Sequence, residues 1–322
     1  MMMNSSKMLF STTMILGIIT TTSSNNWIMM WCGLEISMIS FIPLMINKKS
    51  ISSESTIKYF IVQSVSSSIL MLGLVFMIMK GDYNYEYMLM TALLVKTGVA
   101  PFHNWVLTVL SGLSYNMCLI MISINKVAPL LMMSFLTTSI SMIIMITMIV
   151  GAVLGINQNS FKKIIGYSSI YNMGLILTII KSNIMWILYM TVYSIMLFLM
   201  IYIIKINYID FINQMVMMET INNKMSMWMN LLSMGGMPPF MGFFIKYIVL
   251  YEMINMKSMM LSMLITLIIS SLLVMMFYMR ITFLAVMNNL MYCKNKMYNI
   301  YETSLWVIVI NISMLPILFM IK

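Results

Sequence analysis

Charged side chains are scarce in this chain of 322 residues, in which Asp, Glu, Lys and Arg together make up 8%. A soluble domain carries about a quarter charged residues, so this sequence has too few charges to cover a surface that faces water. Hydrophobic residues make up 61% and form continuous runs, without the alternation that is typical of a membrane β-barrel strand. The scarcity of charge excludes a soluble domain and predicts an all-α polytopic membrane protein.

Cysteine and histidine are sparse as well. Cys32, Cys118 and Cys293 stand far apart without a C-x-x-C pair, and His103 is the single histidine. The chain therefore lacks the ligand spacing of a zinc site or an iron–sulfur cluster and the two histidines of a bis-histidine haem. It also lacks a P-loop and a G-x-G-x-x-G motif. We expect no metal and no bound cofactor in this chain.

Arginine occurs once, as Arg280, although the formal net charge is +10. The lysines are scattered between apolar runs rather than clustered, which argues against a nucleic-acid partner. The chain also contains 48 methionines. Residues with AT-rich codons replace those with GC-rich codons, which indicates a gene in an AT-rich mitochondrial genome.

Apolar runs of about 20 residues are long enough to cross a bilayer as helices. We predict about eleven spans in a single membrane domain that covers residues 1–322. The spans are expected at 8–24, 27–46, 56–79, 86–110, 113–136, 138–156, 163–180, 184–205, 226–254, 258–286 and 303–321. With this count, ten cations lie on the side of the N-terminus and four on the other side. The positive-inside rule therefore predicts a matrix-side N-terminus.

A short internal repeat lies inside two of these spans. The segment Gly98-Val99-Ala100-Pro101-Phe102 is similar to Gly236-Met237-Pro238-Pro239-Phe240, 138 residues later. Proline removes a helix hydrogen bond and glycine loosens the backbone, so both spans are predicted to be broken helices. Paired interruptions of this kind are typical of a transport site near the middle of the membrane.

Charges inside the predicted spans need a reason, because burial of a charge in hydrocarbon is costly. Glu35 lies about 12 Å deep, eight residues into its span. Lys126 is central in its span, whereas Lys96 and Lys246 accompany the two breaks. One interpretation is a proton relay, in which each lysine gains or loses a proton as its surroundings change. The alternative is that these charges only tie helices together.

Several polar residues remain open to two interpretations. His103, just after the first break, either relays protons or caps the broken helix. Tyr167, Ser168 and Ser169 either hold water along a polar axis or form hydrogen bonds between helices.

Five segments, taken together, resemble the subunit 2 family of NADH dehydrogenase, a core chain of respiratory complex I. They are Trp31-Cys32-Gly33-Leu34-Glu35-Ile36 with the following Ser40-Phe41-Ile42-Pro43-Leu44, 94–105 around the first break, Lys126-Val127-Ala128-Pro129-Leu130, Gly166-Tyr167-Ser168-Ser169-Ile170, and 235–246 around the second break. They occur in order along residues 31–246. The residue bias is similar to that of insect and other invertebrate members.

This resemblance implies an antiporter-like fold with two inverted repeats, each with a broken helix, in the mitochondrial inner membrane. It implies that Glu35 pairs with Lys96, that Lys126 is the central relay, and that Lys246 exchanges protons with the far side. Its partners would be other complex I subunits, especially antiporter-like and small membrane-arm chains, and membrane lipids. NADH, FMN, iron–sulfur clusters and ubiquinone would be bound by other subunits.

The chain departs from the family pattern at two positions. Thr108 stands where the family commonly has a glutamate, and Asn172 stands where it often has a histidine. Asparagine can hold a water but cannot take up a proton, so a histidine-dependent step is not expected there. A stand-alone cation/proton antiporter of the related fold is the alternative function, and a structural membrane scaffold is a third.

Overall fold

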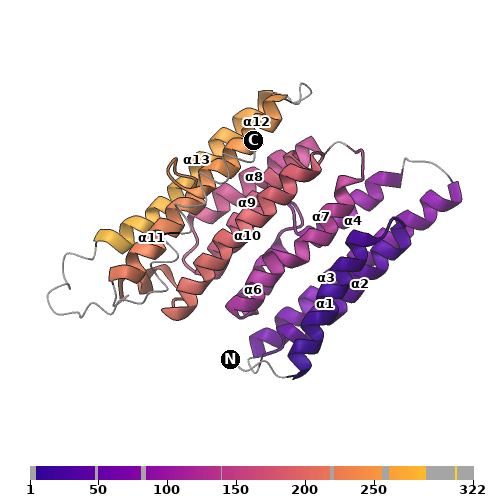
Figure 1. The fold of residues 1–322 in the computed structure, drawn as a ribbon, viewed down its shortest axis with the longest axis horizontal. Helices are drawn as coiled ribbons and strands as arrows, with labels where there is room; N and C mark the ends of the chain where they lie inside the picture. Colours follow the sequence, from indigo (N-terminus) through magenta and orange to yellow (C-terminus); the bar gives the residue numbers. More distant parts are fainter. Residues whose placement is uncertain are drawn as a thin grey trace. The chain divides into compact units, whose positions relative to one another are not determined.

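The computed structural model describes residues 5–47, 50–80, 85–138, 140–217, 221–255, 261–287 and 309. The chain divides into two compact units, residues 1–143 and 144–322, which are described separately here (Figure 1). The described residues of both units are almost entirely helical.

The first unit contains two long antiparallel neighbours, a longer third helix, and two pairs of short helices. Its helices are α1 (Ser5–Ser23), α2 (Trp27–Met45), α3 (Ser50–Lys80), α4 (Glu86–Thr97), α5 (Asn104–Gly112), α6 (Tyr115–Ile122) and α7 (Ile124–Ser134). Helix α1 packs along α2, α3 packs against α4 and α5, and α4 contacts α7. These contacts bring the helices that carry Glu35, Lys96 and Lys126 into one core.

The second unit is built in the same way from long helices and one interrupted pair. Its elements are α8 (Ser141–Ile156), α9 (Phe161–Thr178), α10 (Asn183–Ile206), the 3-10 helix η2 (Ile212–Met217), α11 (Ile221–Gly235), α12 (Met241–Asn255) and α13 (Leu261–Met287). Helix α11 packs against α13, and α12 contacts both α9 and α10. Lys246 on α12 therefore lies in a core formed by helices of its own unit.

Hydroxyl groups inside these helices bond to the helix that carries them. Ser66 donates to the carbonyl of Gln63 at 2.7 Å, and Thr178 donates to that of Leu175 at 2.6 Å. Such bonds satisfy a polar side chain without any partner from outside the helix. Helix α3 begins at Ser50, six residues before the predicted span begins at 56. Its serine-rich start forms the same bonds, so these hydroxyls are satisfied within the helix.

Five of the described helical stretches are long and apolar enough to cross a membrane. They are Trp27–Met45, Ser50–Met79, Tyr115–Ser134, Asn183–Ile206 and Leu261–Phe283. The two broken spans are not in this set, because each supplies two helices of only 9 to 15 residues. The count of about eleven stays a prediction. The predicted span 303–321 lies outside the described residues, apart from Val309.

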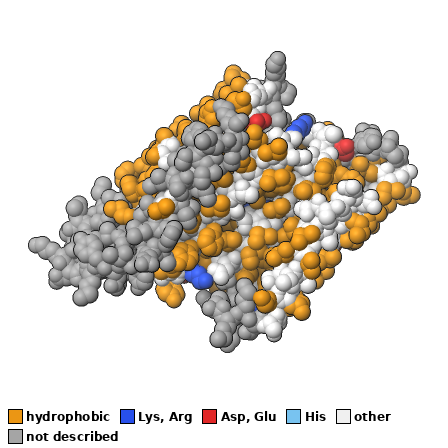
Figure 2. Space-filling model, in the orientation of Figure 1, with side chains coloured by type: hydrophobic (Ala, Val, Ile, Leu, Met, Phe, Trp, Pro, Cys, Tyr) orange, Lys and Arg blue, Asp and Glu red, His pale blue; other side chains and the backbone are white. Residues whose placement is uncertain are grey.

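Apolar side chains cover the outside of the described helices. Figure 2 shows them spread over the visible face, with few Lys, Arg, Asp or Glu side chains among them. Leu16, Ile57 and Leu272 are each more than half exposed, at 56%, 59% and 57%. Water would not favour such a surface, whereas lipid chains would.

Helices α1 and α2 approach each other most closely at two glycines. A Cβ at Gly33 would lie 2.7 Å from the Gly17 carbonyl oxygen, and a Cβ at Gly17 would lie 2.9 Å from the Gly33 carbonyl oxygen. Small residues of this kind let two helix backbones meet directly. Because Gly33 precedes Glu35 by two residues, this contact fixes the part of α2 that presents the carboxylate.

Candidate functional site

The first break separates α4 from α5 through a left-handed glycine. Gly98 has φ 72° and ψ 41°, a conformation that glycine adopts without the cost of a Cβ. The backbone N–H groups of Gly98 and Val99 both donate to the Leu94 carbonyl, at 3.1 and 3.2 Å, which closes the end of α4. Pro101, which has no N–H to donate, follows in the turn before α5. The predicted interruption is therefore present.

The second break repeats this backbone pattern 138 residues later. Gly236 has φ 83°, and the N–H groups of Gly236 and Met237 both donate to the Leu232 carbonyl, at 3.1 and 3.2 Å. In the first break Phe102 donates to Val99, and in the second Phe240 donates to Met237 in the same way. Pro238 and Pro239 occupy the turn before α12. The short sequence repeat thus corresponds to a repeat of backbone hydrogen bonds.

The two lysines occupy different halves of their broken helices. Lys96 precedes Gly98 by two residues, at the end of α4, whereas Lys246 follows Gly236 by ten residues, within α12. The positions that correspond to them across the repeat are Met234 and Thr108. The backbone is therefore repeated, but the position of the amine is not.

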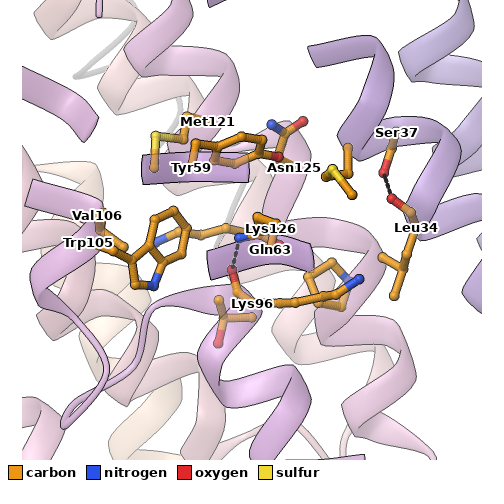
Figure 3. Close-up of a pocket in the computed structure, with 13 residues that line it drawn as sticks. Leu34, Ser37, Tyr59, Gln63, Lys96, Trp105, Val106, Met121, Asn125 and Lys126 are labelled. Atoms are coloured by element: carbon orange, nitrogen blue, oxygen red, sulfur yellow. Dashed lines mark hydrogen bonds between the residues drawn. The ribbon is translucent and has the colours of Figure 1, made fainter. Parts of the chain in front are cut away.

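Glu35 and Lys96 meet inside the first unit. The Lys96 Nζ lies 3.5 Å from Oε1 of Glu35, and the two side chains are 4% and 19% exposed. Figure 3 shows the Lys96 side chain extending toward the helix segment that carries Leu34 and Ser37. A charge-assisted hydrogen bond is usually about 2.7–2.9 Å long, so the two groups form an ion pair with a longer separation than a short hydrogen bond.

A small cavity lies beside this pair. The space available to the centres of water-sized molecules is about 30 Å³, and one water needs about 10–15 Å³ by that measure. The cavity therefore has room for about two waters. Its lining residues come from α2 to α7 of the first unit: Leu34, Ser37, Met38, Tyr59, Gln63, Lys96, Thr97, Trp105, Val106, Met121, Asn125, Lys126 and Pro129 (Figure 3).

Lys126 lines the same cavity, from α7. Its side chain is buried, at 5% exposure, and forms no hydrogen bond or ion pair with the part of the chain that the structure describes. The amide oxygen and nitrogen of the adjacent Asn125 are also buried without a direct partner. Buried polar groups of this kind are usually satisfied by water, which the cavity can hold. Lys96 and Lys126 are thus joined by a space suited to water.

The backbone groups freed at the first break are occupied by side chains. The Trp105 indole N–H donates to the Val95 carbonyl at 3.1 Å, and Gln63 Nε2 donates to the Lys96 carbonyl at 3.2 Å. Sequence reasoning missed both residues, because each contact joins a side chain to the backbone of a different helix. Trp105 lies in segment 94–105, which resembles the family, and this resemblance was the sequence signal that could have identified it.

His103 occupies the N-cap position of α5, but its ring forms no capping hydrogen bond. Nδ1 lies 3.3 Å from the Pro101 carbonyl oxygen, and Nε2 is buried without a direct partner among the described residues. The relay and capping interpretations both stay predictions.

Lys246 is held by the second break itself. Its Nζ donates to the Gly235 carbonyl at 2.6 Å and lies 5.7 Å from the centre of the Tyr171 ring. A carbonyl and an aromatic face both stabilise the charged form of an amine. No carboxylate contacts Lys246 in the described part of the chain. The backbone freed at the break therefore serves as its partner.

The remaining predicted residues lie on α9. Ser168 and Ser169 donate to the carbonyls of Ile165 and Gly166 in their own helix. The Ser168 hydroxyl also faces Tyr193 on α10 and Tyr278 on α13, so both interpretations of these serines stay predictions. Asn172 accepts a hydrogen bond of 2.8 Å from the Tyr189 hydroxyl on α10. Tyr167 packs at the surface of Gly155 on α8, with its Cβ 3.5 Å from where a Cβ of that glycine would stand.

Glu86 is a buried carboxylate that sequence reasoning did not single out. It is 8% exposed at the start of α4 and accepts from both the backbone N–H and the hydroxyl of Thr137, at 3.1 and 2.7 Å. The contact joins the start of α4 to the segment after α7. It therefore links the helix of Lys96 to the helix of Lys126 at a second point.

Comparisons with known proteins identify what this arrangement is similar to. Residues 24–272 match the family model of the membrane region of NADH:quinone oxidoreductase and Mrp antiporter proteins. NADH-ubiquinone oxidoreductase chain 2 of Anopheles gambiae is 37% identical over 265 residues, which cover 78% of this chain and 77% of that protein. The chain 2 protein of Locusta migratoria is 34% identical over 296 residues, covering 88% and 86%.

A solved structure shares the fold. A chain of respiratory complex I from Thermus thermophilus matches with a TM-score of 0.83 over 97% of this chain and 78% of that chain. The two are 17% identical in sequence, so the match establishes the fold alone. Together with the apolar helices, these relatives identify a multi-pass helical membrane protein with an antiporter-like fold.

Proposed function

The chain belongs to the family of NADH-ubiquinone oxidoreductase chain 2, and from this premise we propose that it is a proton-translocating membrane-arm subunit of respiratory complex I. The observation that carries the proposal is the buried pair of Glu35 and Lys96 beside a cavity that Lys126 also lines. Two buried amines line one space for water, and a carboxylate is paired with one of them, which together form a site that can hold and pass protons.

Within the first unit, the proposed relay works through the charge of Lys96. While Glu35 stays close, the carboxylate stabilises the ammonium form of Lys96. When the pair opens, the ammonium loses that partner and its proton can pass to water in the cavity. Lys126 is the other amine on the cavity, and two ammonium groups around so small a space repel each other. The charge on one lysine therefore depends on the charge on the other.

Lys246 is the proposed exchange site of the second unit. The Gly235 carbonyl and the Tyr171 ring stabilise its charged form without fixing the proton as a carboxylate would. A lysine can release that proton, whereas an arginine cannot. We also propose that His103, at the first break, takes part in the relay of the first unit.

The larger setting is part of the same proposal. We place the chain in the mitochondrial inner membrane as a single domain of about eleven spans with two inverted repeats and a matrix-side N-terminus. Its partners are neighbouring antiporter-like and small membrane-arm subunits, together with lipids. NADH, FMN, the iron–sulfur clusters and ubiquinone bind to other subunits, in which the electron transfer takes place.

The test replaces Lys246 in the complex. Lys246→Met is expected to leave the complex assembled on a native gel and to reduce proton translocation per NADH in reconstituted membranes. Lys246→Arg keeps the charge and is expected to be impaired as well, because guanidinium does not release its proton. Lys181→Met, an exposed lysine between α9 and α10, is the matched control and should translocate normally. Normal translocation by an assembled Lys246→Met complex would show that Lys246 is structural.

A stand-alone cation/proton antiporter is the second candidate, because the matching family model also covers Mrp antiporters. Purification under mild detergent separates the two. A complex I subunit is recovered with a large assembly that oxidises NADH, whereas an antiporter is recovered without it.

A further inference from the structure

Four tyrosines from three helices of the second unit are buried together with polar neighbours. Tyr171 on α9, Tyr189 and Tyr193 on α10, and Tyr278 on α13 are 0%, 2%, 2% and 2% exposed. Membrane tyrosines are usually found at the interface, where the hydroxyl reaches water. Here the hydroxyls lie inside the protein, so they require partners there.

Asn172 is the centre of this cluster. The Tyr189 hydroxyl donates to Asn172 Oδ1 at 2.8 Å, which joins α10 to α9. The Tyr193 hydroxyl faces both Asn172 and Ser168, and that of Tyr278 on α13 faces Ser168. Polar groups from three helices therefore converge around Asn172 and Ser168.

Two hydroxyls of the cluster lie beside polar side chains without a well-formed hydrogen bond. The buried oxygen of Tyr171 faces Ser270 and that of Tyr193 faces Asn172 and Ser168, but neither forms a hydrogen bond of normal geometry with the described residues. Leaving a buried hydroxyl unsatisfied is costly, and proteins usually satisfy such groups with ordered water. A tyrosine hydroxyl both donates and accepts, so each of these two can join two waters into a chain.

The cluster borders the site of Lys246. The Lys246 Nζ lies 5.7 Å from the centre of the Tyr171 ring, and it donates to the Gly235 carbonyl at 2.6 Å. The backbone of Gly235 in turn packs on Tyr278, whose Cβ lies 3.7 Å from where a glycine Cβ would stand. The amine at the second break thus adjoins the hydroxyl cluster through Tyr171 and Tyr278.

We propose that the hydroxyls of Tyr171 and Tyr193, together with water, form a neutral relay between Asn172 and Lys246. In each step the tyrosine oxygen accepts a proton from one water while its own proton passes to the next acceptor, so the tyrosine is neutral before and after. Asn172 holds Tyr189 and orients the chain, and Lys246 is the group that stores the proton. This inference rests on the proposed function, and it assigns the connection to hydroxyl groups that carry no net charge.

The test removes single hydroxyls from the assembled complex. Tyr193→Phe and Tyr171→Phe keep the ring and its packing and remove the oxygen. Each is expected to lower the rate of proton translocation about five- to tenfold, the effect of losing one hydrogen bond from a transfer path. Protons translocated per NADH should fall with it, a readout that ring packing does not affect. Tyr247→Phe, which removes an exposed hydroxyl beside Lys246 in α12, should leave translocation unchanged.

A second variant covers the case in which a phenylalanine variant does not assemble. Asn172→Leu removes the acceptor of the Tyr189 hydroxyl from a half-buried position and is expected to slow translocation similarly. Asn172→His should restore translocation and add a dependence on pH near neutrality, since histidine titrates there. Wild-type rates in both Tyr193→Phe and Asn172→Leu would overturn the relay. A wild-type complex that does not translocate protons would instead refute the proposed function.

Discussion

Glu35→Gln tests the ion pair of the first unit with little change in shape. The Lys96 Nζ and the Glu35 Oε1 are 3.5 Å apart, which corresponds to an attraction of about 5 kcal/mol at an effective dielectric constant of 20. The Lys96 side chain is only 4% exposed, so bulk water cannot replace the lost carboxylate. Removing one partner of a buried pair usually costs about 3–5 kcal/mol. The variant therefore removes most of what holds the charged form of Lys96.

The assay is proton translocation per NADH in reconstituted membranes, with assembly followed on a native gel. Glu35→Gln is expected to assemble and to translocate fewer protons than the wild type. The double variant Glu35→Gln with Lys96→Met should be no worse than the more impaired single variant, because the two residues act as one pair. Glu54→Gln breaks the exposed Glu54–Lys58 pair on α3 and is the matched control, expected to behave as the wild type. Independent, additive effects at Glu35 and Lys96 would refute the reasoning.

Two further variants probe the break and the cavity. Gly98→Ala places a Cβ at φ 72°, where it would clash with Val106 Cγ2. The left-handed conformation alone costs about 1–2 kcal/mol, so a lower thermal midpoint of the complex is expected, and an unchanged midpoint would contradict the geometry. Asn125→Leu replaces buried amide atoms that have no direct partner. The complex should still assemble, and translocation should be slower, because the cavity loses a polar group that can bind water beside Lys126. Undiminished translocation would contradict a connection through water between Lys96 and Lys126.

The broken helices could be predicted because their cause is local. Gly98 and Gly236 each supply a left-handed residue, and a proline without an N–H follows each of them. The start of α3 could not be read in the same way, because its serines are typical of a loop when only composition is considered. Their hydroxyls bond to carbonyls of the same helix, so a helical start leaves them satisfied.

The candidate site was predictable only in its charged members. A charge in an apolar span is conspicuous by itself, which identified Glu35, Lys96, Lys126 and Lys246. Trp105 and Gln63 act through hydrogen bonds to the backbone of another helix, and an aromatic or amide side chain in an apolar run gives no signal of that contact. Glu86 was missed for a related reason, since a carboxylate at the start of a span is usually exposed to water.

The two breaks share their hydrogen bonds but carry their amines in opposite halves, and this separation has a consequence for design. The break depends on glycine, proline and backbone groups, none of which titrates. The backbone framework is therefore compatible with an amine on either side of it. Thr108 and Met234 are the positions whose counterparts at the other break, Lys246 and Lys96, carry the amine. Introducing a lysine at either position would test whether a broken helix also works with its amine in the other half.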